Sequence, residues 1–264
     1  MRIRSVVLKT APLAALILLL AQSASAAEIK VMISGGFNAA YRDLIADFER
    51  TTGHRLTTSE GASMGGAPDS IPSRLARGED ADVLILAGPA VDNLIKDGKA
   101  RPGSRVDLAR SLIGMVVRKG ASKPDISTVD ALKRTLLDAK SIAYSASASG
   151  VYLSTEMFAR LGIAEEIKPK TRRIESERVA AVVARGDAEI GFQQVSELLP
   201  EKGTDYVGPL PPELQRATVF SAGIATGSKE PDAARELVKF LASPTASAAV
   251  TKSGLEPITL VRTQ

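Results

Sequence analysis

A run of small hydroxylated residues between residues 144 and 152 has the composition of a site for a negatively charged group. It contains three serines and a glycine: Ser145, Ser147, Ser149 and Gly150. An apolar stretch, residues 141–144, comes before it and predicts a buried strand, and residues 153–161 predict a helix. The first N–H groups of a helix lack partners within the helix, and the helix dipole is positive there. The pattern predicts an anion site, or else a simple serine cap on the helix.

Two earlier segments repeat this arrangement. A strand expected over residues 28–33 ends at a Ser-Gly-Gly turn before a helix, and a short strand over residues 55–59 runs into a glycine-rich turn. Glycines allow a ligand to come close to the backbone. Neither turn is a Walker A loop or a complete dinucleotide fingerprint. We therefore expect these turns to contribute a set of ligand-binding residues: Ser34, Gly35, Gly36, Ser63 and Met64.

The alternation of strands and helices predicts an α/β fold. Three strand–helix pairs fill the first hundred residues, and the third strand, residues 81–87, is continuously apolar, as in a central parallel strand. A second unit of the same kind follows, and the chain then returns to the first. We predict two doubly wound α/β domains joined by a two-crossing hinge, with a ligand cleft between them. The predicted boundaries are 27–110 with 208–264 for the first domain, and 111–207 for the second.

The start of the chain has the features of a secretory signal peptide. Basic residues (Arg2, Arg4, Lys9) precede an apolar run at 11–21, and Ala24-Ser25-Ala26 forms a small-residue cleavage site. The alternative is an uncleaved anchor helix, but the run is short for spanning a bilayer. We expect residues 1–26 to be removed and the mature protein to lie in the periplasm.

Composition excludes several kinds of site. Loss of residues 1–26 removes three basic residues and no acidic one, which lowers the formal charge from +4 to +1 and leaves no basis for binding nucleic acid. The chain has no Cys and a single His, so a disulfide, a thiolate site and a multi-His metal site are excluded. His54 follows a predicted helix and is expected to be a solvated turn residue. Trp is absent and aromatic residues make up 4% of the chain, which disfavours a sugar ligand.

The whole mature chain resembles the periplasmic solute-binding proteins of ABC importers with the type II fold, and within them the molybdate-binding group. The resemblance rests on the Ser34 turn, the Gly61-Ala62-Ser63 turn, the Asp82-Val83 strand and the Gly150-Val151-Tyr152 helix start. It implies that two domains hold an oxyanion through Ser34, Ser63, the 147–149 loop and the loop at Arg178. The family's last contact is a Tyr hydroxyl, and Gln194 stands at that position here. An amide donates and accepts hydrogen bonds, which favours an organic acid over molybdate.

The same segments also resemble a periplasmic branch of this fold with aconitate isomerase activity. That reaction interconverts trans- and cis-aconitate by an allylic proton shift, so it requires a cradle for a polyanion and a group that removes and returns a proton. Three residues are candidates for this group: Tyr152, Glu60 and Glu177. No motif distinguishes among them, and each also has a plain structural interpretation as a solvated or capping residue.

Two functions remain open from the sequence. The first is a binding protein that captures a small organic polycarboxylate or oxyanion for an ABC importer, with molybdate a weaker candidate. The second is an aconitate isomerase on the same fold. We expect neither cofactor nor metal, and we expect a monomer.

Overall fold

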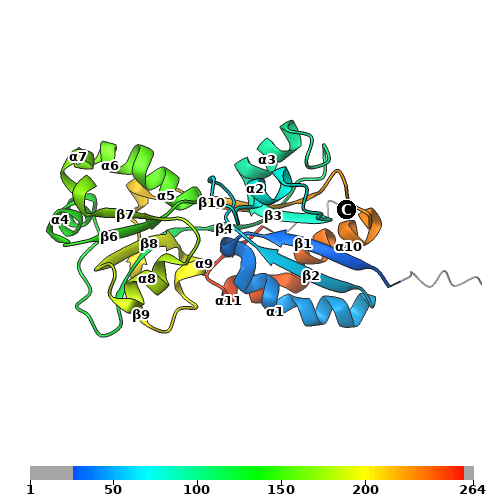
Figure 1. The fold of residues 1–264 in the computed structure, drawn as a ribbon. Helices are drawn as coiled ribbons and strands as arrows, with labels where there is room; N and C mark the ends of the chain where they lie inside the picture. The colour runs from blue at the N-terminus through cyan, green and yellow to red at the C-terminus, as the bar shows by residue number, and fades with distance from the viewer. Residues whose placement is uncertain (1–25, 259–264) are drawn as a thin grey trace, which may run out of the picture.

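The computed structural model describes residues 26–258 and contains two lobes, each built on one β-sheet (Figure 1). The first sheet has the strand order β11-β4-β10-β3-β1-β2, and the second has the order β7-β6-β8-β5-β9. The first sheet contains β1 (Glu28–Ile33), β2 (Arg55–Glu60), β3 (Val83–Ala87), β4 (Val106–Ser111), β10 (Thr218–Ile224) and β11 (Glu256–Pro257). The second contains β5 (Ile113–Arg118), β6 (Ile142–Ser145), β7 (Thr171–Ile174), β8 (Ile190–Gln194) and β9 (Thr204–Pro209).

Helices cover both faces of the first sheet because its central strands are apolar on both sides. In β1, Val31 packs into one hydrophobic cluster and Met32 into another, and Ile85 and Leu84 of β3 divide in the same way. The first cluster lies under α1 (Gly35–Thr52), α10 (Pro231–Leu241) and α11 (Ser247–Lys252), which follows the 3-10 turn Pro244–Ala246. The second lies under α2 (Ile71–Ala76) and α3 (Gly88–Lys96).

The second lobe repeats this layering with its own two clusters. One face carries α4 (Val129–Asp138), α7 (Ala164–Ile167) and a continuous helical run made of α5 (Ala148–Tyr152), a π-helical turn (Leu153–Met157) and α6 (Phe158–Arg160). The other face carries α8 (Val179–Arg185) and α9 (Val195–Leu198). Two 3-10 turns, Lys168–Lys170 and Pro212–Leu214, complete the elements. The doubly wound α/β fold predicted from the sequence is confirmed.

The chain passes between the sheets twice. The first passage is at Leu112, between β4 and β5, and the second is the segment 210–217, between β9 and β10. The consecutive strands β4 and β5, which only Leu112 separates, therefore belong to different sheets. The predicted boundaries fall inside strands: Ser111 pairs with Thr218 in the first sheet, and β9 stays paired with β5 as far as residue 209.

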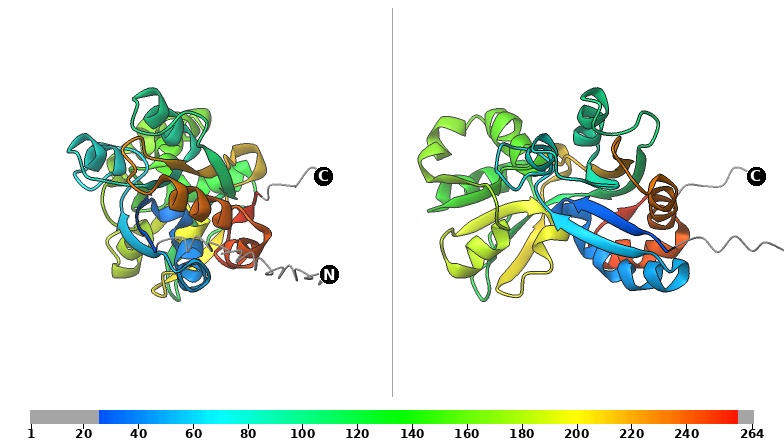
Figure 2. Two further views of the ribbon diagram at one scale, coloured as in Figure 1. Left: turned by 90° about the vertical axis from the view of Figure 1, so that its right-hand side faces the viewer. Right: turned by 45° about the vertical axis from the view of Figure 1, so that its right-hand side comes forward.

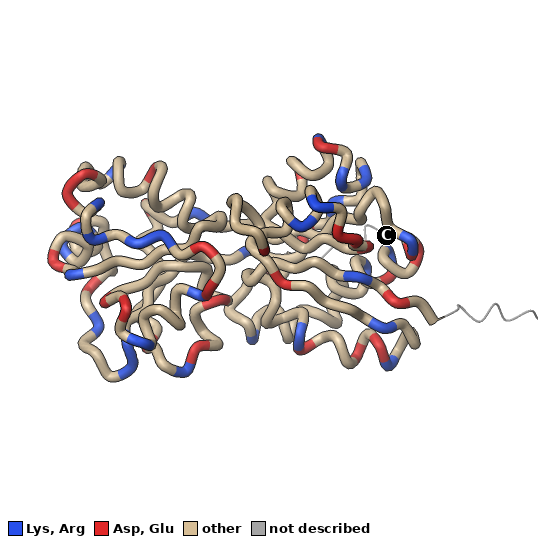
Figure 3. Tube along the Cα trace, viewed as in Figure 1, with Lys and Arg blue, Asp and Glu red and all other residues tan. Residues whose placement is uncertain are grey.

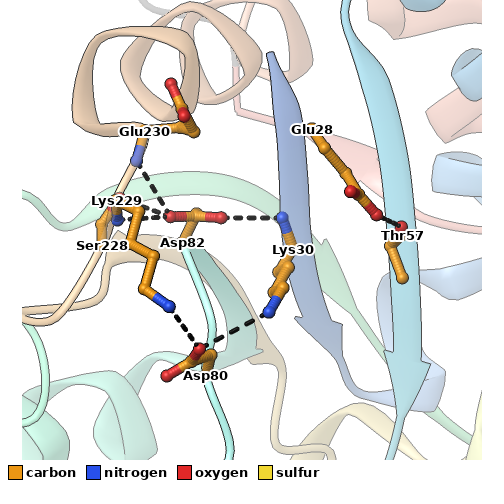
Figure 4. A network of polar contacts seen from close by, with 8 residues as sticks. All are labelled: Glu28, Lys30, Thr57, Asp80, Asp82, Ser228, Lys229 and Glu230. Atoms are coloured by element: carbon orange, nitrogen blue, oxygen red, sulfur yellow. Dashed lines mark hydrogen bonds and ion pairs between the residues drawn. The ribbon is translucent and has the colours of Figure 1, made fainter.

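A buried aspartate ties the returning segment to the first lobe (Figure 4). One carboxylate oxygen of Asp82 accepts hydrogen bonds from the Ser228 hydroxyl (2.8 Å) and the backbone N–H groups of Lys229 (2.9 Å) and Glu230 (3.2 Å). The other accepts from the Lys30 N–H at 2.8 Å. Asp82 thus joins the start of β3 to β1 and to the turn before α10. It lies at the end of β3 away from its carboxyl terminus, so its role is structural.

The prediction for His54 was wrong. Its side chain is only 4% exposed, and Nδ1 accepts a hydrogen bond from the Ala27 N–H at 3.0 Å. Nε2 lies 3.3 Å from a carboxylate oxygen of Glu236. The turn is packed between the start of β1 and α10, so His54 fastens the first strand to the lobe.

The sequence predicts a signal peptide, with an uncleaved membrane anchor as the alternative. Residues 1–25 of the expected signal peptide lie outside the described residues. Within the described part, none of the helices is both long and apolar enough to cross a membrane.

Candidate active site

The carboxyl ends of five strands, β1, β2, β6, β7 and β8, meet in one cleft between the lobes. Strand β1 runs parallel to β2 and β3, and β6 runs parallel to β7 and β8, so each sheet has one edge where these strands end. The right-hand view of Figure 2 shows β1 and β2 directed from their own lobe towards the other one. The cleft encloses about 150 Å³. This is below the roughly 300–1,000 Å³ of pockets for drug-sized ligands, so the cleft suits a small molecule.

The first lobe places two buried serine hydroxyls in the cleft. Ser34 directly precedes α1, is 2% exposed, and its hydroxyl forms no hydrogen bond with the described residues. Ser63 is 1% exposed, and its Oγ accepts a hydrogen bond from the Ala87 N–H at 3.0 Å, which leaves the hydroxyl proton free to donate. Both hydroxyls can therefore donate to an anion beside the first turn of α1.

The second lobe contributes the start of the helical run that begins with α5. Ser147 precedes this run without capping it through its side chain, and Ser149 in the first turn exchanges a hydrogen bond with Ser145 at 3.1 Å. All three serines line the cleft. Gly150 lies behind them, because a Cβ there would come within 1.6 Å of the Ser145 carbonyl oxygen. Gly150 therefore lets the helix pack close to β6 and does not itself line the cleft.

Two amides at the end of β8 have different roles. The Gln193 side chain accepts a hydrogen bond from the Val179 N–H and donates one to Glu197, both at 2.9 Å. Its polar atoms are thus engaged within the protein. Gln194 donates through Nε2 to the Thr218 hydroxyl at 2.8 Å, whereas its Oε1 is buried without a partner among the described residues. Gln194, which lines the cleft, thus has an unused acceptor.

Glu197 is an acid whose surroundings suit proton transfer at neutral pH. It lies in α9, which Figure 1 places between the lobes, and its carboxylate faces Gly35 so closely that a Cβ at Gly35 would lie 2.1 Å from Oε1. Burial raises the pKa of Glu197 to about 7, against the opposing effects of the Arg178 guanidinium and the Gln193 amide. Helix α9 is fixed to the first lobe by the Ser196 hydroxyl, which donates to the Gly36 carbonyl at 2.7 Å.

The other glutamates of the cleft are held as carboxylates by arginines. Glu177 forms an ion pair with Arg185 at 2.7 Å, and this contact lowers its pKa. Burial raises the pKa of Glu60, but the contacts with Arg42 and Asn38 and the charge of Arg178 together outweigh it, so the pKa lies below its usual value. Glu175 pairs with Arg173 at 3.2 Å. Glu60 and Glu177 are therefore weaker bases than a carboxylate with a pKa near 7.

The structure brings most of the predicted site residues together. Eight of them line the cleft: Ser34, Gly35, Gly36, Ser63, Ser147, Ser149, Arg178 and Gln194. Met64 and Tyr152 do not line it and instead border a neighbouring groove. The Tyr152 hydroxyl donates to the Leu214 carbonyl at 2.7 Å, and its ring packs in the core of the second lobe. The hydroxyl that was expected as a proton-transfer group is thus engaged in holding the 3-10 turn Pro212–Leu214.

Sequence reasoning missed Glu197 and the role of Gln193. The signal was present, because an acid one helical turn after the end of a strand lies at the edge where ligands bind. Within the described residues, no cluster of His, Cys, Asp and Glu has the form of a metal site. Basic and acidic residues are interspersed over both lobes instead of forming a face of one sign (Figure 3).

Comparison with known proteins defines the class. Residues 29–256 match the family of bacterial extracellular solute-binding proteins, and the chain belongs to this family. An aconitate isomerase from a Pseudomonas species is 46% identical over 230 residues, covering 87% of this chain and 88% of that protein. The molybdate-binding protein ModA of Azotobacter vinelandii is 30% identical over 242 residues, covering 89% of this chain and 92% of ModA.

The solved structures agree on the fold. The periplasmic molybdate-binding protein of Azotobacter vinelandii superimposes with a TM-score of 0.67 at 21% identity, covering 88% of this chain and 100% of that one. The predicted type II periplasmic binding-protein fold is therefore confirmed.

Proposed function

We propose that this protein is an isomerase of small unsaturated polycarboxylates of the aconitate kind, acting by a one-base allylic proton shift. The observation that carries the proposal is Glu197, a carboxyl group with a pKa near 7 in a cleft built for an anion. The 46% identical aconitate isomerase supports the same assignment. The family supports a periplasmic location, and the expected signal peptide is consistent with it.

The cradle stabilises the charge that develops during the reaction. Hydroxyls of Ser34 and Ser63, the first turn of α1 and the helix start at Ser147 hold carboxylates of the substrate. Loss of a proton from the methylene carbon spreads negative charge over the allylic system onto a carboxylate. Donors that are already positioned for that carboxylate lower the barrier.

Glu197 moves the proton. As a carboxylate it takes a proton from the methylene carbon, and the electron pair of that C–H bond enters the allylic system. As a carboxylic acid it returns the proton to the carbon at the other end, and the double bond shifts by one position. One C–H bond breaks and one forms, so the step balances without a co-reactant. A pKa near the working pH suits a group that must both accept and release the proton.

The second candidate function is binding without chemistry, followed by delivery to an ABC importer. The family and the 30% identical ModA favour it, because the family is one of solute-binding proteins and ModA is a molybdate-binding protein. In this version Glu197 would contribute only to binding. Gln194 would replace the Tyr contact of the molybdate-binding group, which favours a carboxylate ligand over molybdate.

Conversion of Glu197 to its amide separates the two functions. The mature protein is incubated with trans-aconitate, and the change in ultraviolet absorbance follows turnover. Glu197→Gln keeps the shape but cannot accept the proton, so we expect kcat to fall by about 10²–10⁴-fold. Calorimetry should show affinity for aconitate within a few-fold of the unmodified protein.

The matched control is Glu177→Gln, the same change at a cleft glutamate that is already paired with Arg185. It should retain most of the turnover. Wild-type protein that binds aconitate without converting it would support the receptor and contradict the isomerase.

A further inference from the structure

The cleft has an acceptor that a fully ionised polycarboxylate cannot satisfy. Gln194 is 2% exposed and lines the cleft, and its Oε1 has no hydrogen-bond partner among the described residues. Its Nε2 is held by the Thr218 hydroxyl at 2.8 Å, which directs the carbonyl end of the amide away from that contact. Buried acceptors are nearly always paired in folded proteins. A ligand bound in the cleft can supply the partner that Oε1 lacks among the described residues.

The serine hydroxyls of the cleft differ from the Gln194 carbonyl in kind. The Ser34 hydroxyl has no partner in the described part of the chain, and the Ser63 hydroxyl already accepts from Ala87 and so retains its proton for the ligand. These groups donate to carboxylate oxygens, as do the first-turn N–H groups. At Gln194 Oε1 a carboxylate oxygen would instead face another acceptor, and both would remain unpaired.

We infer that the bound ligand carries an O–H group directed at Gln194 Oε1. For an unsaturated tricarboxylate this group is a carboxyl that keeps its proton. For a saturated hydroxytricarboxylate it is the hydroxyl, and all carboxylates stay ionised. The inference deepens the proposed function by stating the protonation state in which the polycarboxylate binds and by adding hydroxytricarboxylates as ligands of the same cleft.

This assignment also bears on catalysis. A carboxyl group that is protonated and hydrogen-bonded withdraws electrons more strongly than a carboxylate. The C–H bond next to it is therefore more acidic, and the charge formed on proton removal is more easily accommodated. Gln194 acts here as a binding residue that selects the reactive ionisation state, while Glu197 performs the transfer.

Two saturated ligands test the inference without turnover. Tricarballylate and citrate carry the same three carboxylates, and citrate has an additional hydroxyl. Each is titrated by calorimetry at pH 8 into Glu197→Gln protein, so that Glu197 cannot take up a proton. We expect citrate to bind about tenfold more tightly, because its hydroxyl supplies the O–H group without the free-energy cost of protonating a carboxylate at pH 8. Tricarballylate should take up close to one proton per complex, measured by repeating the titration in buffers of different ionisation enthalpy.

Two further substitutions locate the effect. Gln194→Met keeps the length of the side chain and removes the acceptor, so it should bring the two affinities to within about threefold. Thr218→Val removes the contact that holds Nε2, lets the amide turn over, and should also narrow the difference. If Gln194→Met does not fold, the difference between the two affinities in Thr218→Val tests the inference in its place.

Equal affinities for the two ligands with no proton uptake would overturn the inference, because Nε2 would then face the ligand. Failure of both ligands to bind would overturn it as well. Wild-type protein that shows the expected discrimination but does not convert trans-aconitate would leave the inference standing and remove the isomerase proposal alone.

Discussion

At the level of single residues, Glu197 combines a raised pKa with a position that only glycine at residue 35 allows. The carboxylate occupies the space where a side chain at Gly35 would begin. This proximity places the acid beside the first turn of α1, next to the anion cradle. The pKa near 7 is a consequence of burial that the Arg178 charge does not fully offset.

The pKa of Glu197 makes turnover depend on pH. Proton removal needs Glu197 as a carboxylate, so kcat should fall as the pH drops below about 7. A bound anion favours the protonated form further, so the midpoint in the complex should lie at or above this value. Initial rates at saturating trans-aconitate between pH 5 and pH 9 measure it. A kcat independent of pH over this range would contradict the assignment.

The same pKa predicts the direction of a stability change. The folded protein keeps a proton on Glu197 that the unfolded chain releases above its ordinary pKa of 4.5. The stabilisation is therefore complete below 4.5 and is lost as the pH rises through about 7. Relative to Glu197→Gln, the wild type should lose about 1–3 kcal/mol of unfolding free energy between pH 4.5 and pH 8. Urea unfolding of both proteins at the two pH values provides the comparison.

At the level of elements, the end of β8 and the short helix α9 form one functional unit. Gln193 connects the start of α8, through the Val179 N–H, to the carboxylate of Glu197. The Ser196 hydroxyl anchors the same helix to α1. The base is thus positioned by two hydrogen bonds from opposite sides, one from each lobe.

Gln193 should tune the base without touching the substrate. Its amide donates to the Glu197 carboxylate and so lowers the pKa. Gln193→Leu removes the donor, and the midpoint of the kcat profile should move to higher pH, with a smaller change in KM than in kcat near pH 7. Gln193→Glu cannot donate when ionised and should shift the midpoint in the same direction. An unchanged midpoint in both variants would mean that Gln193 has only a structural role.

Asp82 is expected to stabilise the fold at the end of β3 that lies away from the cleft. Removing this buried carboxylate leaves the Lys30, Lys229 and Glu230 N–H groups without their acceptor. Asp82→Ala should therefore cost about 2–4 kcal/mol of unfolding free energy while leaving the cleft unchanged. Asp80→Ala is the matched control, since the ion pairs of Asp80 with the described residues Lys30 and Lys229 are exposed and their loss should have little effect. Urea unfolding at neutral pH measures both.

The elements were more predictable from the sequence than the contacts between them. Apolar periodicity indicated β1, β3 and the helices that follow them, because residues buried between a sheet and its helices are apolar and recur at regular spacing in the local sequence. The turns at Ser34, Ser63 and Ser147 were found because each is a short run of small residues between a predicted strand and a predicted helix. Glu197 was missed, and the contacts of Tyr152 were not foreseen. The surroundings of each depend on a residue far along the chain: Gly35 for Glu197 and Leu214 for Tyr152.

At the level of the whole molecule, the lobes contact each other across the mouth of the cleft as well as at its base. The base is the α9–α1 contact through Ser196. At the mouth, the Ser176 hydroxyl in the loop after β7 donates to the Asp69 carboxylate at 3.1 Å. This hydrogen bond joins residues 107 positions apart and brings together loops from different lobes. The cleft is therefore bounded on both sides by contacts between lobes.

The Ser176–Asp69 contact should stabilise the closed arrangement around a ligand. Both residues line the cleft, so the bond can form only when the two loops approach each other. Ser176→Ala removes the donor, and a net loss of one hydrogen bond of about 0.5–1.5 kcal/mol corresponds to a roughly 2- to 12-fold weaker ligand. The effect should appear mainly as faster dissociation, because closure holds the ligand after it has entered.

Stopped-flow dissociation of citrate or aconitate from the two proteins measures this effect. Ser122→Ala, the same change at an exposed serine outside the cleft, is the control and should dissociate at the wild-type rate. Asp69→Asn provides a second reading of the same bond, because an amide oxygen can still accept from Ser176 and should retain most of the affinity. Dissociation that stays unchanged in Ser176→Ala would show that closure is set at the base of the cleft alone, by the packing of α9 against α1.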